Sequence, residues 1–178
     1  MNEAFIPAIS EVGDLFGRGK LFLPELMLAA DVMKAVTDLI NEKVEGADAA
    51  ARQGGTTVIA TVEGDVHDIG KCIVVSLMRA NGFTVHDLGR DVETDRIIAE
   101  ALEVNADVTG TSALLTSTML QQKQLEEALK TSGLRHRFKT IVGGAPVTPR
   151  WAARIGADAY AEDAQDGVAK VKQLLMPR

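Results

Sequence analysis

The chain has 178 residues, of which 46% are hydrophobic and 25% charged, and its formal net charge is -6. A chain of this length can bury about 70% of its unfolded surface, so it needs no disulfide framework, which its single cysteine could not build. The acidic balance argues against a nucleic-acid partner, because phosphate binding requires clustered Lys and Arg. The N-terminus lacks the apolar core of a signal peptide, and no apolar run approaches the length of a membrane span. We therefore expect a cytoplasmic protein without a membrane partner.

Residues 1–45 are predicted to form two helices. Apolar residues recur at spacings of three and four from Phe5 to Phe16, which places them on one face of a helix. Gly17–Lys20 interrupts this pattern, and Pro24 suits the first turn of a second helix that continues to about Val44. Such a hairpin cannot bury both of its apolar faces alone. We expect it to be a helical cap that packs on the second domain, on a ligand or on another chain.

Residues 46–55 are small, polar and bounded by glycines, and they are predicted to be an interdomain linker. Residues 56–178 then alternate between strand-like and helix-like patterns, which predicts a parallel sheet with helices on both faces. A flavodoxin-like (Rossmann-type) five-stranded order is the economical topology, so the fold class is α/β. The expected strands are 56–62, 84–88, 107–112, 140–142 and 157–161. The expected helices are 71–81, 93–104, 119–131, 148–155 and 166–176.

The loop after the first strand carries the strongest chemical signal. His67 stands between Asp65 and Asp68, and Gly70 closes the loop. A metal-binding imidazole presents one nitrogen to the metal, while a carboxylate commonly fixes its other N–H. His86 and His136 lack such neighbours and are interpreted as structural or solvated. His67 is therefore predicted to be a metal ligand, with Asp65 behind it.

The sequence offers too few ligands for a self-contained metal site. Structural zinc needs about four nitrogen or sulfur ligands, and catalytic zinc needs about three protein ligands. One histidine backed by a carboxylate suits a metal whose other positions belong to a macrocycle. This leaves haem or a corrinoid.

Two further loops are expected at the same sheet edge. Residues 110–118 follow the third strand and supply five hydroxyl groups, more than the single hydroxyl that a helix cap requires. Gly143 and Gly144 follow the fourth strand and remove side chains that would bar a ligand's close approach. Since carboxyl ends of parallel strands meet at one edge, the three loops are predicted to form one site.

Three motifs in this order and at this spacing resemble a known family. Asp65-x-His67-x-x-Gly70, Ser112-x-Leu114-x-Thr116 and Gly143-Gly144 are similar to the cobalamin-binding module of methionine synthase. They also resemble the corrinoid proteins of methylamine, methanol, betaine and methoxyarene methyltransferase systems. The resemblance implies cobalamin or a related corrinoid as cofactor, held as methylcobalamin or cob(I)alamin and containing cobalt.

The resemblance also assigns roles to residues. It implies that His67 replaces the cofactor's own benzimidazole as the lower axial cobalt ligand, with Asp65 and Thr118 as a proton-linked relay behind it. It implies that the nucleotide tail runs into the sheet beside the serine loop and the glycine pair. The implied cofactor-binding residues are Gly64, Asp65, Val66, His67, Asp68, Ile69, Gly70, Ser112, Leu114, Thr116, Gly143 and Gly144.

The helical hairpin is similar to the family's cap, and this match assigns Phe16, Leu23 and Leu26 to the upper, methyl-bearing face of the corrin. Plain core packing explains the same residues equally well. Relatives carry two further helices before this hairpin, so the cap resembles a partial bundle. Our hypothesis is that its exposed apolar faces drive formation of a homodimer.

The function implied is that of a non-catalytic carrier subunit in a methyltransferase system of one-carbon metabolism. A substrate-specific methyltransferase would load a methyl group onto cobalt. An acceptor-side methyltransferase would then pass the group to tetrahydrofolate or to a thiol such as coenzyme M. A corrinoid-reactivating protein is a further expected partner. The alternatives are a cobalamin-binding sensor or regulatory module, a carrier subunit of a mutase, and a plain flavodoxin-like receiver domain.

Overall fold

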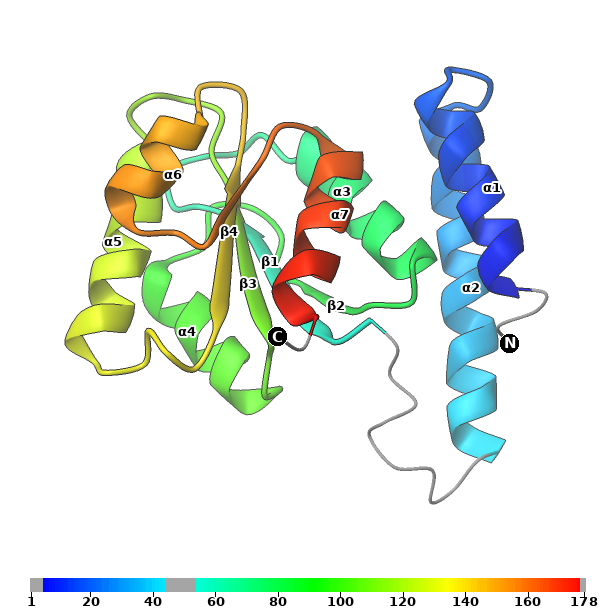
Figure 1. The fold of residues 1–178 in the computed structure, drawn as a ribbon, viewed down its shortest axis with the longest axis horizontal. Helices are drawn as coiled ribbons and strands as arrows, with labels where there is room; N and C mark the ends of the chain where they lie inside the picture. Colours follow the sequence, from blue (N-terminus) through cyan, green and yellow to red (C-terminus); the bar gives the residue numbers. More distant parts are fainter. Residues whose placement is uncertain (1–4, 44–53, 177–178) are drawn as a thin grey trace.

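The computed structural model describes residues 5–43 and 54–176, which form a helical hairpin followed by an α/β domain (Figure 1). The helices are α1 (Phe5–Gly17), α2 (Leu23–Lys43), α3 (Ile69–Ala80), α4 (Thr94–Glu103), α5 (Met119–Thr131), α6 (Pro149–Ile155) and α7 (Ala164–Leu175). The strands are β1 (Thr56–Thr61), β2 (Thr84–Asp87), β3 (Val108–Ser112), β4 (Lys139–Gly143) and β5 (Ala159–Ala161). The alternation that the sequence predicts after residue 55 is confirmed.

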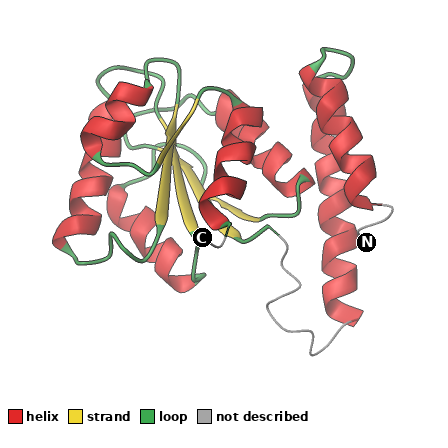
Figure 2. Cartoon of the chain, viewed as in Figure 1, coloured by secondary structure: helices red, strands yellow, loops and turns green. Residues whose placement is uncertain are grey.

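The five strands form one parallel sheet in the order β2-β1-β3-β4-β5 (Figure 2). This is the predicted flavodoxin-like order, in which β1 lies centrally and the chain reverses direction across the sheet between β1 and β3. Every residue of β1 is buried, as expected for a β-branched apolar strand covered on both faces. The loops after β1, β3 and β4 consequently meet at one edge.

Helices cover both faces of the sheet (Figure 1). Because side chains alternate along a strand, Ile59 of β1 joins a core with α3 and α7, whereas its neighbour Val58 joins a core with α4 and α5. Each fully buried aliphatic side chain contributes about 1.5–3 kcal/mol of transfer free energy. Two separate apolar cores thus hold the sheet between its helices.

The helical hairpin packs against α3. Leu26 of α2 is fully buried in the core that contains Val75 and Leu77 of α3, and Phe16 packs against that core. The backbone N–H of Gly19 donates to the carbonyl of Phe16 over 2.9 Å, which ends α1 in the predicted glycine loop. The predicted end at Val44 and most of the predicted linker lie outside the described residues, and the domain boundaries remain a prediction.

Arg135, in the loop between α5 and β4, ties several elements together. Its Nε lies 2.7 Å from Oε2 of Glu126, which is almost fully buried, and its Nη2 donates to Asp158 Oδ2 over 2.9 Å. Nη2 also donates to the Gly156 carbonyl over 2.8 Å. Burial raises the pKa of the Glu126 carboxyl, although the neighbouring Thr140 hydroxyl and Arg135 oppose this shift.

Arg135→Met should therefore destabilise the protein by about 3 kcal/mol, because it leaves the Glu126 carboxylate buried without its cation. The matched control is Arg137→Met, since Arg137 donates only at an exposed position, to Asn105 over 2.8 Å. Urea denaturation monitored by circular dichroism measures both free energies of unfolding. Equal losses in the two variants would contradict this role of Arg135.

The loss in Arg135→Met should also depend on pH. A carboxyl group with a raised pKa in the folded state keeps its proton there to higher pH than in the unfolded chain, so its ionisation lowers stability as pH rises. The stability deficit of Arg135→Met should consequently be larger at about pH 8 than at about pH 5. A deficit that grows as pH falls would be the wrong sign.

Candidate functional site

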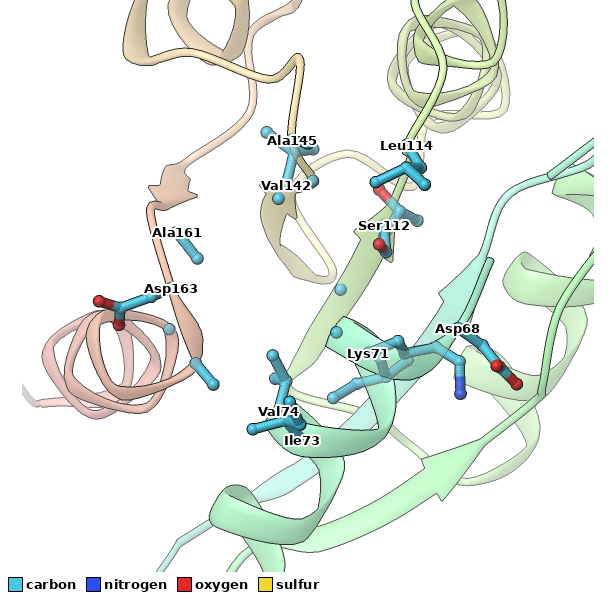
Figure 3. Close-up of a pocket in the computed structure, with 18 of the residues that line it drawn as sticks. Asp68, Lys71, Ile73, Val74, Ser112, Leu114, Val142, Ala145, Ala161 and Asp163 are labelled. Carbon is cyan, nitrogen blue, oxygen red and sulfur yellow. The ribbon is translucent and has the colours of Figure 1, made fainter. Parts of the chain in front are cut away.

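A cavity of about 870 Å³ opens at the carboxyl edge of the sheet, on the face covered by α3 and α7 (Figure 3). Its floor is apolar and includes Ile59, Met78 and Ile141. In Figure 3, Ser112 at the end of β3 and Leu114 just after it border the cavity, and Ala161 at the end of β5 and Asp163 in the following loop border it from another side. The walls comprise residues 66–71, 110–112, 114, 142–145 and 160–164. The predicted convergence of loops at this edge is therefore present.

His67 lies in the wall with its ring held from behind. Its Nδ1 is 2.9 Å from Oδ1 of Asp65, and its backbone N–H donates to the same oxygen over 3.0 Å. A carboxylate only accepts hydrogen bonds, so Nδ1 donates to Asp65, and Nε2 is the ring nitrogen left for another partner. The His67 side chain is 49% exposed. The imidazole thus presents Nε2, in an orientation that Asp65 fixes, to a ligand in the cavity.

Asp65 connects the loop after β1 to the loop after β3. Its second oxygen, Oδ2, accepts the backbone N–H of Leu114 over 2.6 Å and lies 2.8 Å from the Thr118 hydroxyl. The Asp65 side chain is fully buried, and this desolvation would raise its pKa, but hydrogen bonds from Leu114, His67 and Thr118 outweigh it. The pKa of Asp65 is consequently held well below its usual range, and the carboxylate stays ionised.

The β2–α4 loop supports the turn before His67. Asp91 adopts a positive φ of 55°, accepts the backbone N–H of Gly64 at its Oδ1 over 2.7 Å, and donates its own N–H to the Asp65 carbonyl over 3.0 Å. Gly64 also has a positive φ, of 77°, which suits a residue without a side chain. These contacts fix the backbone that carries Asp65 and His67.

The two glycines after β4 differ in what they require. A Cβ on Gly144, whose φ is 125°, would lie 1.8 Å from the Ala113 carbonyl oxygen. A Cβ on Gly143 would meet only Ala161, with its carbonyl oxygen at 3.4 Å. Gly144 is therefore needed so that the β4 loop can lie directly against the β3 loop, and together they form one wall of the cavity.

The donor set fits a macrocyclic metal cofactor. Among residues 5–43 and 54–176, no group of three or more His, Cys, Asp or Glu side chains is placed to hold a metal ion. Of the three histidines, His67 alone lines the cavity, whereas His86 pairs with Glu100 over 3.1 Å. One imidazole nitrogen beside a large, apolar-floored cavity suits a metal whose remaining ligands come from a macrocycle with a bulky substituent.

Most residues that the sequence assigns to cofactor binding lie together, although their roles remain predictions. Gly64, Asp65 and Thr118 support the wall from behind, while Thr116 is exposed outside the lining. Phe16, Leu23 and Leu26 do not line the cavity, and their assignment to the upper corrin face also stays a prediction. The predicted residues that line it are Val66, His67, Asp68, Ile69, Gly70, Ser112, Leu114, Gly143 and Gly144.

Sequence reasoning missed the end of β5 and the start of α7 with the loop between them, which supply residues 160–164 of the wall. The position of this loop after a predicted strand of the same sheet could have revealed it. It also missed Lys71, whose buried Nζ lies 2.5 Å from Oδ1 of Asp87 at the end of β2. In Figure 3 the Lys71 side chain runs toward Asp68. Its charge is paired with the Asp87 carboxylate at the end of β2.

The chain matches known families over most of its length. Residues 55–169 match the B12 binding domain family, and residues 1–41 match a second B12 binding domain family. The chain is 54% identical to the dimethylamine corrinoid protein of Methanosarcina barkeri over 176 residues, covering 98% of this chain and 82% of that protein. It is 51% identical to dimethylamine corrinoid protein 2 of Methanosarcina acetivorans over 176 residues, covering 99% and 81%.

A solved structure shows the same arrangement. The methanol:cobalamin methyltransferase complex MtaBC from Methanosarcina barkeri contains a chain with a TM-score of 0.85 and 31% identity. The match covers 97% of this chain and 65% of that chain. In the part of this chain that the structure describes, none of the helices is long and apolar enough to cross a membrane.

Removing the Thr118 hydroxyl should show how much its hydrogen bond to the buried Asp65 carboxylate stabilises the fold. Thr118→Val deletes a donor to a buried carboxylate and should lower the free energy of unfolding by about 1.5–3 kcal/mol. Thr118→Ser keeps the hydroxyl and should retain most of that stability. Urea denaturation of both ligand-free variants provides the comparison, and equal stability of the two would show that the Thr118–Asp65 contact contributes nothing.

Proposed function

The chain belongs to the B12-binding corrinoid protein family, and from this premise we propose that His67 is the lower axial ligand of the cofactor's cobalt. A corrinoid is its cofactor, and it is a methyl carrier that works with methyltransferases. When bound, the cobalt supplies the chemistry by accepting and releasing a methyl group. What the chain contributes is ligation, placement of the cofactor, and shielding.

The observation that carries this proposal is the contact between His67 Nδ1 and Asp65 Oδ1 at 2.9 Å. It leaves Nε2 as the nitrogen that can bind a metal, and an ionised carboxylate behind the ring makes that nitrogen a better donor. Thr118 and the Leu114 N–H hold the carboxylate in turn. Asp65 and Thr118 thus fix the imidazole's tautomer and direction.

The cavity supports a second part of the proposal, in which it receives the nucleotide tail of the corrinoid. Its floor of Ile59, Met78 and Ile141 suits an aromatic base, since burying apolar surface is favourable. Ser112 lies in the wall at the mouth and offers a hydroxyl to the polar part of the tail. Gly143 and Gly144 keep the adjacent wall free of side chains.

For the partners, the similarity to corrinoid proteins named for dimethylamine supports a substrate-specific methyltransferase whose donor is a methylated amine. This similarity also favours the methyl-carrier prediction over the sensor and mutase alternatives. The further expected partners are an acceptor-side methyltransferase, using tetrahydrofolate or a thiol such as coenzyme M, and a corrinoid-reactivating protein. Both would have to reach the cobalt of the bound corrinoid.

His67→Ala should retain some corrinoid through tail contacts, while its visible spectrum loses the signature of an axial nitrogen and methyl transfer slows. Asp65→Asn should keep the ligand but weaken corrinoid binding by about 10–100-fold, as expected for the partner of a metal-binding histidine. The control is His86→Ala, which alters a histidine outside the cavity. A His67→Ala protein with the spectrum and transfer rate of the native chain would contradict the proposed ligation.

We also propose that the hairpin supports a homodimer. Leu28 is 66% exposed and Val32 56%, and Phe22 just before α2 is 73% exposed, so the hairpin presents apolar side chains that α3 does not cover. Light scattering of the cobalamin-loaded protein should give the mass of a dimer, and Leu28→Glu with Val32→Glu should shift it to a monomer. A native chain that runs as a clean monomer would overturn this part of the proposal.

A further inference from the structure

Gln122, near the start of α5, has a fully buried side chain. Its Nε2 donates to the Thr111 carbonyl and to the Gly143 carbonyl, each over 3.1 Å. Its Oε1 accepts the indole N–H of Trp151 on α6, also over 3.1 Å. An indole N–H can only donate, so this contact assigns the amide oxygen to Trp151 and the amide nitrogen to the two carbonyls.

The two carbonyls lie where β3 and β4 end. Ser112 pairs with Gly143 in the sheet register, so Thr111 immediately precedes the serine loop and Gly143 begins the glycine pair. The Gly143 carbonyl also accepts the backbone N–H of Ala113 over 3.2 Å. Gln122 therefore bridges the last pairs of these two strands from the sheet face opposite the cavity, and it is not among the residues of the cavity wall.

The spacing of the two loops has little tolerance. A side chain on Gly144 would collide with the Ala113 carbonyl, so the β4 loop already rests against the β3 loop. A single side-chain amide provides two N–H groups in a fixed fork, which can hold two neighbouring carbonyls at once. An apolar side chain of the same length would remove the hydrogen bonds to both carbonyls, which lie in a buried part of the protein.

We propose that Gln122 is a positioning residue for the corrinoid's nucleotide tail, because it sets the separation of the serine loop and the glycine pair. This inference rests on the proposed function, in which the cavity between these loops receives the tail. The Gln122 side chain hydrogen-bonds to Thr111, Gly143 and Trp151, and not to His67, Asp65 or Thr118. It acts on the tail end of the cofactor and leaves the cobalt end to the loop after β1.

Two ligands distinguish an effect on the tail end from an effect on the cobalt end. Aquocobalamin carries the nucleotide tail, and diaquocobinamide has the same corrin ring and cobalt but lacks the tail. Gln122→Met, measured by visible titration of the full chain, should raise the Kd of aquocobalamin by about tenfold or more. Its Kd for diaquocobinamide should stay within about twofold of the native value. Equal changes for both ligands, or no change for either, would overturn the inference.

Trp151→Phe provides a second, milder variant. It removes only the donor that orients the Gln122 amide, so it should raise the Kd of aquocobalamin by about threefold and leave diaquocobinamide unaffected. Thermal unfolding of each ligand-free variant shows whether it is folded. If Gln122→Met does not fold, Trp151→Phe decides, and the same two outcomes, equal changes or none, count against the inference.

A failure of the inference about Gln122 can be told apart from a failure of the proposed cobalt ligation by His67. His67→Ala should weaken diaquocobinamide binding, because that ligand depends on the cobalt contact. If His67→Ala leaves diaquocobinamide binding unchanged, the proposed cobalt ligation is wrong. If instead His67→Ala behaves as expected but Gln122→Met affects both ligands equally, only the role of Gln122 is wrong.

Discussion

The buried Asp65 carboxylate is the contact on which the site depends. It accepts the His67 backbone N–H and lies beside the His67 ring nitrogen, the Leu114 N–H and the Thr118 hydroxyl. A buried carboxylate stays ionised only when its oxygens are hydrogen-bonded, so these partners have to be in place together. The direction of the His67 ring is thereby coupled to the loop after β3. His67, the proposed lower ligand, and the wall of the cavity are thus parts of one hydrogen-bond network.

The described site divides into two ends with separate supports. At the cobalt end, Asp65 and Asp91 fix the turn that carries His67. At the proposed tail end, Gln122 binds a carbonyl of each of β3 and β4, and Gly144 lets the loops after these strands lie together. Both supports are built from buried or backbone contacts of the sheet, which suits a lower half that stays rigid. The hairpin packs against α3, beside these supports.

Much of this arrangement could be predicted from the sequence. The alternation of apolar strands and amphipathic helices determines the parallel sheet, and the sheet determines that the loops carrying His67, Ser112 and Gly143 meet. The spacing of Asp65 and His67 indicates their contact, because a single intervening residue, Val66, allows the carboxylate to reach Nδ1. Thr118 was reached only through the resemblance, since nothing local distinguishes it from the other hydroxyls of its loop.

Other features could not be predicted. Gln122 binds backbone carbonyls far from it in sequence, and carbonyls carry no residue-specific signal. Asp91 acts through a positive φ that its residue type permits but does not require. Leu26 is fully buried against α3, and its assignment to the corrin face stays a prediction. An apolar stripe alone does not reveal which surface covers it.

Electron paramagnetic resonance of the cobalt(II) form, prepared with histidine labelled by nitrogen-15, tests the central claim most directly. If His67 is the axial ligand, the triplet splitting that an axial nitrogen-14 produces should become a doublet in the labelled protein. A triplet that survives labelling would show that the cofactor's own base remains on the cobalt, and it would contradict the ligation on which this account depends.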